Sequence, residues 1–478
     1  MLRYLGPKLK KLKRLNIHMQ PENTIIDTYR LIGGLNLNTL NKLNLKFKDF
    51  LSLYIFRYKA YLLLKKFKQP DWCFFEIPDI FYDDISYYSI PSKFNSKKSI
   101  NNMFNSILDK IGLNSQENKL ISTLAIDIVL DSVSIVDTIT NFLIKTGIIF
   151  IPFFEAINYF SYLVFSYIGT IVPLEDNFFS TLNSTIFSGG SFCFIAKNIK
   201  CNINLSTYFR TQSEDFAQFE RTLLIVDNSS YIIYTEGCSA PIFLESQLHV
   251  ALVEILVKEK GILNYSTIQN WYRGDQSGEG GLYNFTTKRG WCLKKALLDW
   301  VQIEMGSAIT WKYPSTYLIG NYSSSNFFSL SLISDMQISD TGNKMLHIGS
   351  YTKSHVYSKS ISLNKSIYAY RGLVKIFKNA KYTYNYTECN SLLLGNNTFT
   401  ITIPYTIVNN FSTFINQEAS ISKLESDFIF FLLQRGINLK TAISLLIIGF
   451  CQNICSKLPL ELELEVPLLI LMRTQSNF

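Results

Sequence analysis

The sequence predicts a mainly β protein, in which a long middle region of short strands forms a parallel coil between helical segments. A strand-like period of two recurs between about residues 188 and 405, for example at Tyr265, Thr267 and Gln269. Almost no helical period appears in this region, and Gly, Asn and Ser interrupt it often. Asn-Gly and Asp-Gly hairpin signals are missing from it, which favours stacked parallel strands over antiparallel hairpins.

Helical patterns flank this middle region. Leu and Phe are spaced with Lys between them over residues 36–68, which predicts a helix that ends near Pro70. Helical patterning returns over residues 100–174. It appears again after Ala419, where Gly436 separates two helices. These helices could cover the sheet edges that an open coil leaves at its two ends.

One apolar run, residues 156–173, is close to the ~20 residues that a membrane-spanning helix requires. Polar residues such as Asn158, Ser161 and Ser166 interrupt this run, and Glu155 precedes it. The sequence therefore predicts a buried helix and no membrane span.

Composition indicates a globular chain with a large core, because 47% of the 478 residues are hydrophobic and 17% are charged. The enrichment in Phe, Tyr, Ile, Asn and Lys is typical of AT-rich coding and points to an organelle or a similarly biased genome. The net charge of +9 is concentrated near the N-terminus, with a basic cluster at residues 8–14. Such a cluster allows an RNA-binding arm as an alternative function, or simply a solvated tail.

Two cysteines stand out as candidates for thiol chemistry. Cys238 lies in YTEGCSAP, where small neighbours predict an accessible sulfur, and Cys389 lies between Glu388 and Asn390. A reactive thiol needs partial exposure and a lowered pKa. The residues alone leave structural and reactive roles open for both. No phosphate-binding Gly-x4-Gly-Lys-Ser/Thr motif occurs, so the chain is not expected to hydrolyse a nucleotide.

Several motifs are similar to those of one known family. They include LSTYFR, QFERTLLIVD, YTEGCSAP, YSTIQNWYRGD, GSAITWKYPS and DTGNKMLHIG, and matches run from about Phe56 to beyond Met472. Together they resemble the SufB family, the scaffold subunits of the SUF iron–sulfur cluster assembly machinery. The biased composition is similar to that of members encoded in reduced plastids, including the apicoplast. The resemblance therefore implies a plastid location.

The resemblance implies a right-handed parallel β-helix flanked by N-terminal and C-terminal helical domains. We expect a basic, partly helical N-terminal extension at residues 1–55 and a helical domain at residues 56–185. The β-helix core is expected at residues 186–415. A C-terminal helical domain at residues 416–478 would dock the ATPase partner, mainly through residues 420–459.

The function implied by the resemblance is that of a non-enzymatic scaffold. It would accept persulfide sulfur and iron, assemble a transient iron–sulfur cluster and transfer it to apo-proteins. ATP hydrolysis is expected in the partner SufC. The other expected partners are the paralogue SufD and the desulfurase SufS with its carrier SufE. A reduced flavin is associated with the family's complexes, although no residue here marks its site. Nucleic acid is not an expected partner.

The resemblance also assigns the site residues. Cys238 matches the family's sulfur acceptor, and Arg210 matches a residue near it. Gln269, Trp271 and Lys288 match polar residues along the interior path that the sulfur would follow.

At the other end of this path, Cys389 matches the cysteine that would ligate the nascent cluster at the SufD interface. Glu418 matches a second residue that assists assembly, so Cys389 and Glu418 are the expected metal and cluster ligands. The family's histidine before this glutamate is replaced here by Gln417, which provides no imidazole ligand.

A second alternative is a carbohydrate-active enzyme built on a β-helix. Such sites need paired carboxylates at a suitable separation. The candidate acids Asp275, Glu279, Glu304 and Asp340 show no paired motif.

Overall fold

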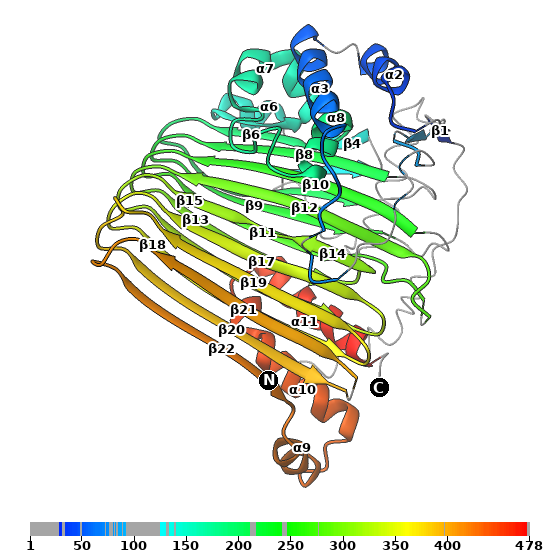
Figure 1. Cartoon of the computed structure of the whole chain (residues 1–478), viewed down its shortest axis with the longest axis vertical. Helices are drawn as coiled ribbons and strands as arrows, with labels where there is room; N and C mark the ends of the chain where they lie inside the picture. The colour runs from blue at the N-terminus through cyan, green and yellow to red at the C-terminus, as the bar shows by residue number, and fades with distance from the viewer. Residues whose placement is uncertain are drawn as a thin grey trace.

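The computed structural model describes residues 28–30, 34–47, 50–71, 73–75, 80, 82, 85–87, 89–91, 125–130, 133–137, 140–210, 217–240, 246–275, 277–395 and 397–475. Its centre is a coil of about seven turns, in which the chain passes back and forth between two ten-stranded sheets (Figure 1). The predicted mainly β fold, with a parallel coil between helical segments, is confirmed. The basic cluster at residues 8–14 lies outside the described residues.

The first sheet contains the strands that begin each turn of the coil. They are β5 (Ile148–Pro152), β6 (Ser191–Ile195), β8 (Ala217–Val226), β10 (Ser246–Val257), β12 (Gly281–Cys292), β14 (Ile309–Lys312), β15 (Ser315–Leu318), β17 (Ile338–His347), β19 (Ile367–Ile376) and β21 (Phe399–Val408). Its strands pair in parallel, except that β5 and β6 are antiparallel. This parallel pairing explains why the sequence carries no hairpin signals.

The second sheet contains the strands that complete each turn. They are β3 (Ala125–Leu130), β4 (Val133–Asp137), β7 (Lys200–Arg210), β9 (Tyr231–Ser239), β11 (Ile262–Asn270), β13 (Leu297–Met305), β16 (Ser324–Ile333), β18 (Lys353–Leu363), β20 (Tyr384–Leu394) and β22 (Phe414–Lys423). β3 and β4 pair antiparallel at one edge, and the remaining pairs are parallel. A separate antiparallel pair joins β1 (Thr28–Arg30) to β2 (Ser89–Pro91).

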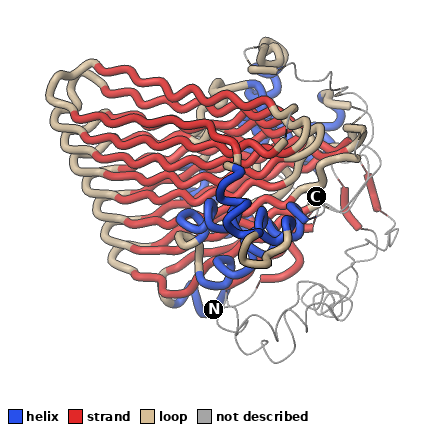
Figure 2. The backbone as a smooth tube through the Cα atoms, turned by 90° about the horizontal axis from the view of Figure 1, so that it is seen from below, coloured by secondary structure: helices blue, strands red, loops and turns tan. Residues whose placement is uncertain are grey.

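The turns that lead from the first sheet to β7, β9, β11, β13, β16, β18 and β20 each place one residue in the left-handed conformation. The non-glycine residues with this conformation include Asn198, Ser229, Lys260, Lys295, Tyr322, Tyr351 and Tyr382, with φ between 53° and 64°. The rings of the last three stack on one another, with centroids 4.8 and 5.2 Å apart. The repeated turns form one side of the coil (Figure 2). Stacking along this side helps to hold successive turns in register.

Helices cover the outer faces of the two sheets. α2 (Leu37–Phe47), α3 (Leu51–Leu64), α6 (Thr140–Lys145), α7 (Phe153–Tyr167) and α8 (Phe178–Ile186) gather at the N-terminal end of the coil (Figure 1). Apolar side chains of α3, α7 and α8 pack on the outer face of the first sheet. The predicted helix over residues 36–68 is therefore two helices. The run at residues 156–173 lies largely in α7, and no described helix has both the length and the apolar character to cross a bilayer.

A buried ion pair joins the N-terminal helices to the first sheet. Arg221 on β8 donates to the Glu254 carboxylate on β10, and neither side chain is exposed to solvent. The same carboxylate accepts hydrogen bonds from the backbone amides of Gly169, Ile171 and Val172, just after α7. Full hydrogen bonding of this kind is what makes a buried charge tolerable.

The predicted helical pattern over residues 100–174 is wrong at residues 125–130, 133–137 and 148–152, which form β3, β4 and β5, whereas α6, α7 and α8 confirm or extend it elsewhere. Residues 100–124 of the prediction lie outside the described residues. The runs AIDIVL and VSIVD in β3 and β4 are rich in Ile and Val, which favour strands. The strand region also continues past the expected boundary at residue 415, because β22 ends at Lys423. The helices α9 (Ser426–Leu433), α10 (Leu439–Cys455) and α11 (Leu460–Gln475) follow, and α10 and α11 pack on the outer face of the second sheet.

Candidate functional site

The interior of the coil contains two neighbouring rows of polar side chains on the second sheet. The first row is Cys238, Gln269, Glu304, Ser331, Ser360 and Ser391, and the second is Glu236, Thr267, Gln302, Ser329, Ser358 and Cys389. Strand alternation directs all twelve side chains toward the first sheet, and all are buried. We call them the polar rows. Hydrophobic side chains occupy the interior beside them, so the polar rows are confined to part of each strand.

Cys238 and Cys389 lie near opposite ends of the polar rows. Cys238 is on β9 and Cys389 is on β20, five strand steps apart through β11, β13, β16 and β18. At ~4.8 Å per step this corresponds to a separation of about 24 Å. Every inward residue of the polar rows between the two cysteines carries a hydroxyl, amide or carboxyl group. On the second sheet, the two thiols are thus connected by polar side chains on every intervening strand.

The structure buries Cys238 with only 4% of its surface exposed, so the prediction of an accessible sulfur is wrong. Phe209, Trp271 and Leu282 pack around it. Burial raises the pKa of the Cys238 thiol well above its ordinary value, and the Glu220 and Glu236 carboxylates raise it further. The thiol is therefore protonated near neutral pH unless a neighbouring group accepts its proton.

Lys288 extends into the polar interior from the first sheet. Its Nζ donates to the Tyr265 hydroxyl at 2.9 Å and lies 3.7 Å from Glu236 Oε2, which the same hydroxyl contacts. Burial lowers the pKa of Lys288 to about 8. Lys288 can consequently give up or take a proton close to neutral pH, within the same network that holds Glu236.

The structure places two more predicted residues beside Cys238. Gln269 is paired with Cys238 on the neighbouring strand and accepts a 2.6 Å hydrogen bond from Asn284 Nδ2. Trp271 follows β11 and lies against His249, with ring centroids 4.7 Å apart. Gln269, Trp271 and Lys288 therefore surround the sulfur acceptor that the resemblance indicates.

Two other predicted residues are not brought to the thiols. Arg210 follows Phe209, which pairs with Cys238, so strand alternation directs Arg210 to the opposite face of the sheet. Glu418 is exposed on β22 and pairs with Glu388, whereas Cys389 pairs with Ala419. Glu418 and Cys389 thus lie on opposite faces of the second sheet.

Cys389 lies one strand before the C-terminal edge of the coil and is 1% exposed. It packs with Ile333, Tyr368 and Tyr370. Burial raises the pKa of the Cys389 thiol to about 12, and the hydrogen bond with the Tyr370 hydroxyl partly opposes this shift. Side chains on both faces of β22 are exposed, so the interior opens at this end of the coil.

Sequence reasoning missed several charged residues that face the polar rows from the first sheet. Glu220 on β8, His249 on β10 and Lys312 on β14 are all buried. Lys312 pairs with Glu304 across the interior. The only signal was a polar residue at alternate positions in strands such as QFERT, and this pattern does not reveal which strands face each other.

The acids considered for carbohydrate chemistry are engaged elsewhere. Glu304 pairs with Lys312, and Asp340 pairs with Arg371 on the outer face of the first sheet. The Asp275 carboxylate accepts hydrogen bonds from the Ser277 hydroxyl and the Glu279 amide within one exposed turn. Among the described residues these acids form no catalytic pair.

Comparison with known families matches residues 209–450 to the SUF system FeS cluster assembly, SufBD core domain. The chain belongs to the SufBD family. It is 52% identical to the iron–sulfur cluster assembly protein SufB of Plasmodium falciparum, over 97% of both chains. It is 45% identical to the SufBD family protein ycf24 of Guillardia theta over 88% of both chains. The chloroplastic SufBD family protein ABCI8 of Arabidopsis thaliana is 40% identical over 95% of this chain and 82% of the relative.

Membership of the SufBD family confirms the predicted resemblance and a role in iron–sulfur cluster assembly. The relatives from Plasmodium, an alga and a chloroplast fit the plastid-type composition of the sequence. The comparisons support neither the RNA-binding alternative nor the carbohydrate-active one.

Proposed function

We propose that this SufBD chain accepts sulfane sulfur at Cys238, passes it along the polar rows after its reduction to sulfide, and holds the nascent cluster at Cys389. The observation that supports this route is the unbroken line of buried polar side chains between the two thiols. A buried polar line is costly for folding, which favours a functional reason for it. Gln269, Trp271 and Lys288 would position the sulfur at the start of the route, and Arg210 would act from the outer face.

Sulfur acceptance begins with loss of the Cys238 proton. Burial raises the pKa of Glu220 to about 7, so its carboxylate can accept this proton near neutral pH. The thiolate attacks the outer sulfur of a donor persulfide, the donor's S–S bond breaks and the donor leaves as a thiolate. Cys238 then carries the persulfide.

Releasing this sulfur as sulfide takes two electrons and two protons, and it regenerates the Cys238 thiol. We assign the electrons to a reductant outside this chain. Reduced flavin is the proposed source because of the family resemblance, and the described residues form no recognisable site for it. Hydroxyl and amide groups of the polar rows would solvate the sulfide on its way to Cys389.

Cluster assembly at Cys389 would draw on ligands from outside the chain. Thiolates suit the iron of such clusters. Glu418 lies on the opposite face of the sheet from Cys389, so it would join the cluster only after β22 rearranges. The open end of the coil beside β21 and β22 is the proposed contact with the paralogue SufD, which would supply the missing ligands.

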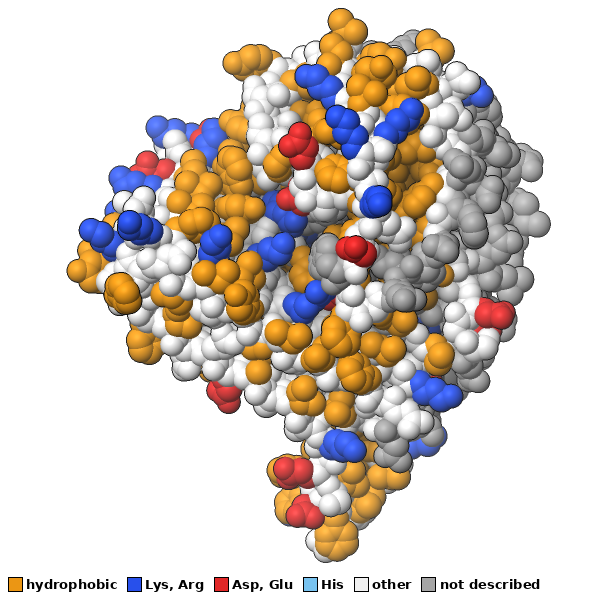
Figure 3. All heavy atoms as spheres, viewed as in Figure 1, with side chains coloured by type: hydrophobic (Ala, Val, Ile, Leu, Met, Phe, Trp, Pro, Cys, Tyr) orange, Lys and Arg blue, Asp and Glu red, His pale blue; other side chains and the backbone are white. Residues whose placement is uncertain are grey.

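α9 is the proposed docking site for the ATPase SufC. None of its residues is buried, and Phe428, Phe430, Phe431 and Leu433 are exposed. The space-filling view shows apolar side chains on this protruding end of the molecule (Figure 3). A contiguous exposed apolar surface of this kind marks an interaction site. SufS with SufE would deliver the sulfur, apo-proteins would receive the cluster, and a plastid is the proposed location.

The test is cluster assembly by the full chain with its partners, driven either by the desulfurase with cysteine or by free sulfide. Cys238→Ser should abolish only the desulfurase-driven reaction, because free sulfide bypasses the acceptor. Cys389→Ser should abolish both. Cys292→Ser, a buried cysteine among apolar side chains, is the matched control and should retain both. Undiminished cluster absorbance in Cys389→Ser would refute the ligand role.

A further inference from the structure

Four side chains with metal-ligand chemistry converge at the Cys238 end of the polar interior. Glu236 and Cys238 lie on β9, Glu220 lies on β8 and His249 lies on β10. The ligand atoms of Glu220, Glu236 and Cys238 are all within 4.8 Å of one another. His249 Nε2 lies 3.3 Å from Glu220 Oε2. All four side chains are buried, so the cluster is not a chance grouping of exposed acids.

Polar atoms of this cluster lack hydrogen-bond partners. Both carboxylate oxygens of Glu220 and the Nε2 atom of His249 are buried and make no hydrogen bond of good geometry among the residues that the structure describes, although Nε2 and Oε2 lie 3.3 Å apart. Buried polar atoms are normally satisfied, because leaving them unpaired is costly. Since these atoms point toward the same small space, a bound ligand is a direct explanation for them.

The orientation of His249 supports a metal ion as this ligand. Asn284 donates through Nδ2 to Gln269, so its Oδ1 accepts from His249 Nδ1 at 3.0 Å. Nδ1 therefore carries the proton in the neutral ring, and Nε2 directs a lone pair toward Glu220. Metal-bound histidines are commonly held in this way, with the other ring nitrogen donating to a neighbouring oxygen.

We propose that Glu220, Glu236, Cys238 and His249 form a binding site for one divalent first-row transition metal ion. A thiolate and an imidazole together select Fe²⁺, Zn²⁺ or Co²⁺ over Mg²⁺ and Ca²⁺, which prefer oxygen ligands alone. Tetrahedral bonds of 2.0–2.3 Å place ligand atoms roughly 3.5 Å apart. Side-chain movements of about 1 Å would bring the ligand atoms of Glu220, Glu236 and Cys238 to this geometry. His249, whose Nε2 lies 3.3 Å from Glu220, would complete the set by moving toward them.

Charge at the site is consistent with a cation. Glu220 and Glu236 provide two carboxylates, and Cys238 loses its proton when it binds a metal. Lys288 remains 3.7 Å from Glu236, and the Tyr265 hydroxyl contacts the same carboxylate, so these two groups would hold Glu236 in place. The metal site does not rest on sulfur transfer, because these contacts exist whether or not Cys238 ever carries a persulfide.

Anaerobic titration of the reduced, metal-free full chain with Co²⁺ tests this proposal. We expect one equivalent to bind, with a thiolate-to-cobalt charge-transfer band. Cys238→Ser should abolish the band, and Glu220→Gln and His249→Gln should each raise the Kd about 10–100-fold. Cys292→Ser on β12 and Cys451→Ser on α10, both buried among apolar side chains, are controls that should leave both the band and the Kd unchanged. The absence of binding by the wild type, or a band that survives in Cys238→Ser, overturns the proposal.

A measurement on the wild-type chain avoids any question of whether the variants fold. X-ray absorption of the chain loaded with one equivalent of Fe²⁺ should show one sulfur at about 2.3 Å and the remaining ligands as nitrogen or oxygen at about 2.0–2.2 Å. A shell with no sulfur, or with two or more, would place the iron elsewhere and overturn the proposal.

Discussion

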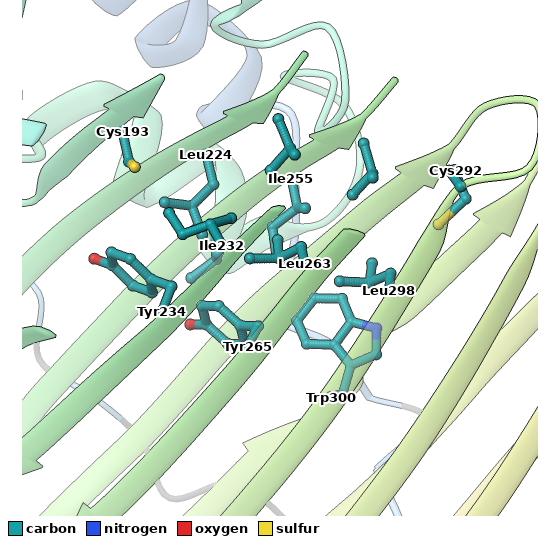
Figure 4. Packing of buried hydrophobic residues seen from close by; sticks show 14 of the residues in the cluster. Cys193, Leu224, Ile232, Tyr234, Ile255, Leu263, Tyr265, Cys292, Leu298 and Trp300 are labelled. Atoms are coloured by element: carbon teal, nitrogen blue, oxygen red, sulfur yellow. The ribbon is translucent and has the colours of Figure 1, made fainter. Parts of the chain in front are cut away.

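The interior of the coil has an apolar half and a polar half that are built on the same strands. The apolar half packs side chains of the second sheet against others of the first sheet (Figure 4). Its members on the second sheet include Ile232, Tyr234, Leu263, Tyr265, Leu298 and Trp300, and those on the first include Cys193, Leu224, Ile255 and Cys292. On β9, Tyr234 and Glu236 mark the boundary, only two residues apart.

The difference between the halves separates stability from chemistry. Burial of aliphatic and aromatic side chains in the apolar half stabilises the fold in proportion to the area removed from water. The polar half offers little net stabilisation, because its groups exchange water for protein partners such as the Lys312–Glu304 pair. We therefore expect substitutions in the polar half to affect function and those in the apolar half to affect folding.

The largest expected effect comes from obstructing the polar rows. Ser358→Leu fills the space beside Cys389 with an apolar side chain and should abolish desulfurase-driven cluster assembly. Val356→Leu, two residues away in the apolar half, should cost about 1–3 kcal/mol through overpacking while retaining assembly. Assembly rates per folded molecule for the two variants provide the comparison. Equal loss in both would show that the halves are not functionally distinct.

A large stability effect is expected in the apolar half. Leu298→Ala should reduce the free energy of unfolding by about 2–5 kcal/mol, because it removes a fully buried side chain and leaves a cavity. Denaturant unfolding measures this loss. Ser329→Ala in the polar rows, also buried, should change stability by less than about 1 kcal/mol. The interpretation fails if the serine variant is the less stable of the two.

In the metal-free chain, titratable groups in the two halves should also change the free energy of unfolding with pH in opposite directions. Burial lowers the pKa of His347, in the apolar half, from 6.5 to about 4, so the folded state binds fewer protons than the unfolded state in this window. Burial of the neutral His347 ring therefore carries no penalty above pH 6.5, and the free energy of unfolding decreases as pH falls from 6.5 toward 4. Burial raises the pKa of Glu220 from 4.5 to about 7, so its contribution is lost as pH rises through that range.

In the wild type, titration of His347 should lower the free energy of unfolding by about 1–3 kcal/mol on acidification, and His347→Gln should abolish this decrease. Titration of Glu220 should lower it by a similar amount toward neutral pH, and Glu220→Gln should abolish that decrease. Unfolding free energies measured between pH 4 and 8 distinguish the two. Parallel curves for the wild type and both variants would contradict the assignment.

The smallest effect is expected from an isosteric change on the route. The Thr267 hydroxyl is buried without a hydrogen-bond partner among the described residues. Thr267→Val should change stability by less than about 1 kcal/mol and slow sulfur delivery on the order of threefold, because one polar group of the rows is lost. Thr235→Val, on the outer face of β9, is the control that should not slow delivery. Faster delivery in Thr267→Val would indicate that the route does not need a polar wall.

Some features of the site were predictable from residues and others were not. The motifs around Gln269, Trp271 and Lys288 placed these residues near Cys238, and the structure brings them together there. Glu220 and His249 gave no comparable signal. They lie on strands of the first sheet, and they come to face Cys238 on the second sheet only when the coil has formed. Glu418 was expected beside Cys389, but the register of β22 sets it on the other face.

The sequence by itself determined the parallel coil and its helical flanks, because the period of two, the missing hairpin signals and the return of helical spacing are local properties of the chain. Tertiary structure alone decided which polar residues share the interior and which face outward. Those outcomes depend on the register between strands about thirty residues apart, where a shift of one residue would reverse the face of every side chain.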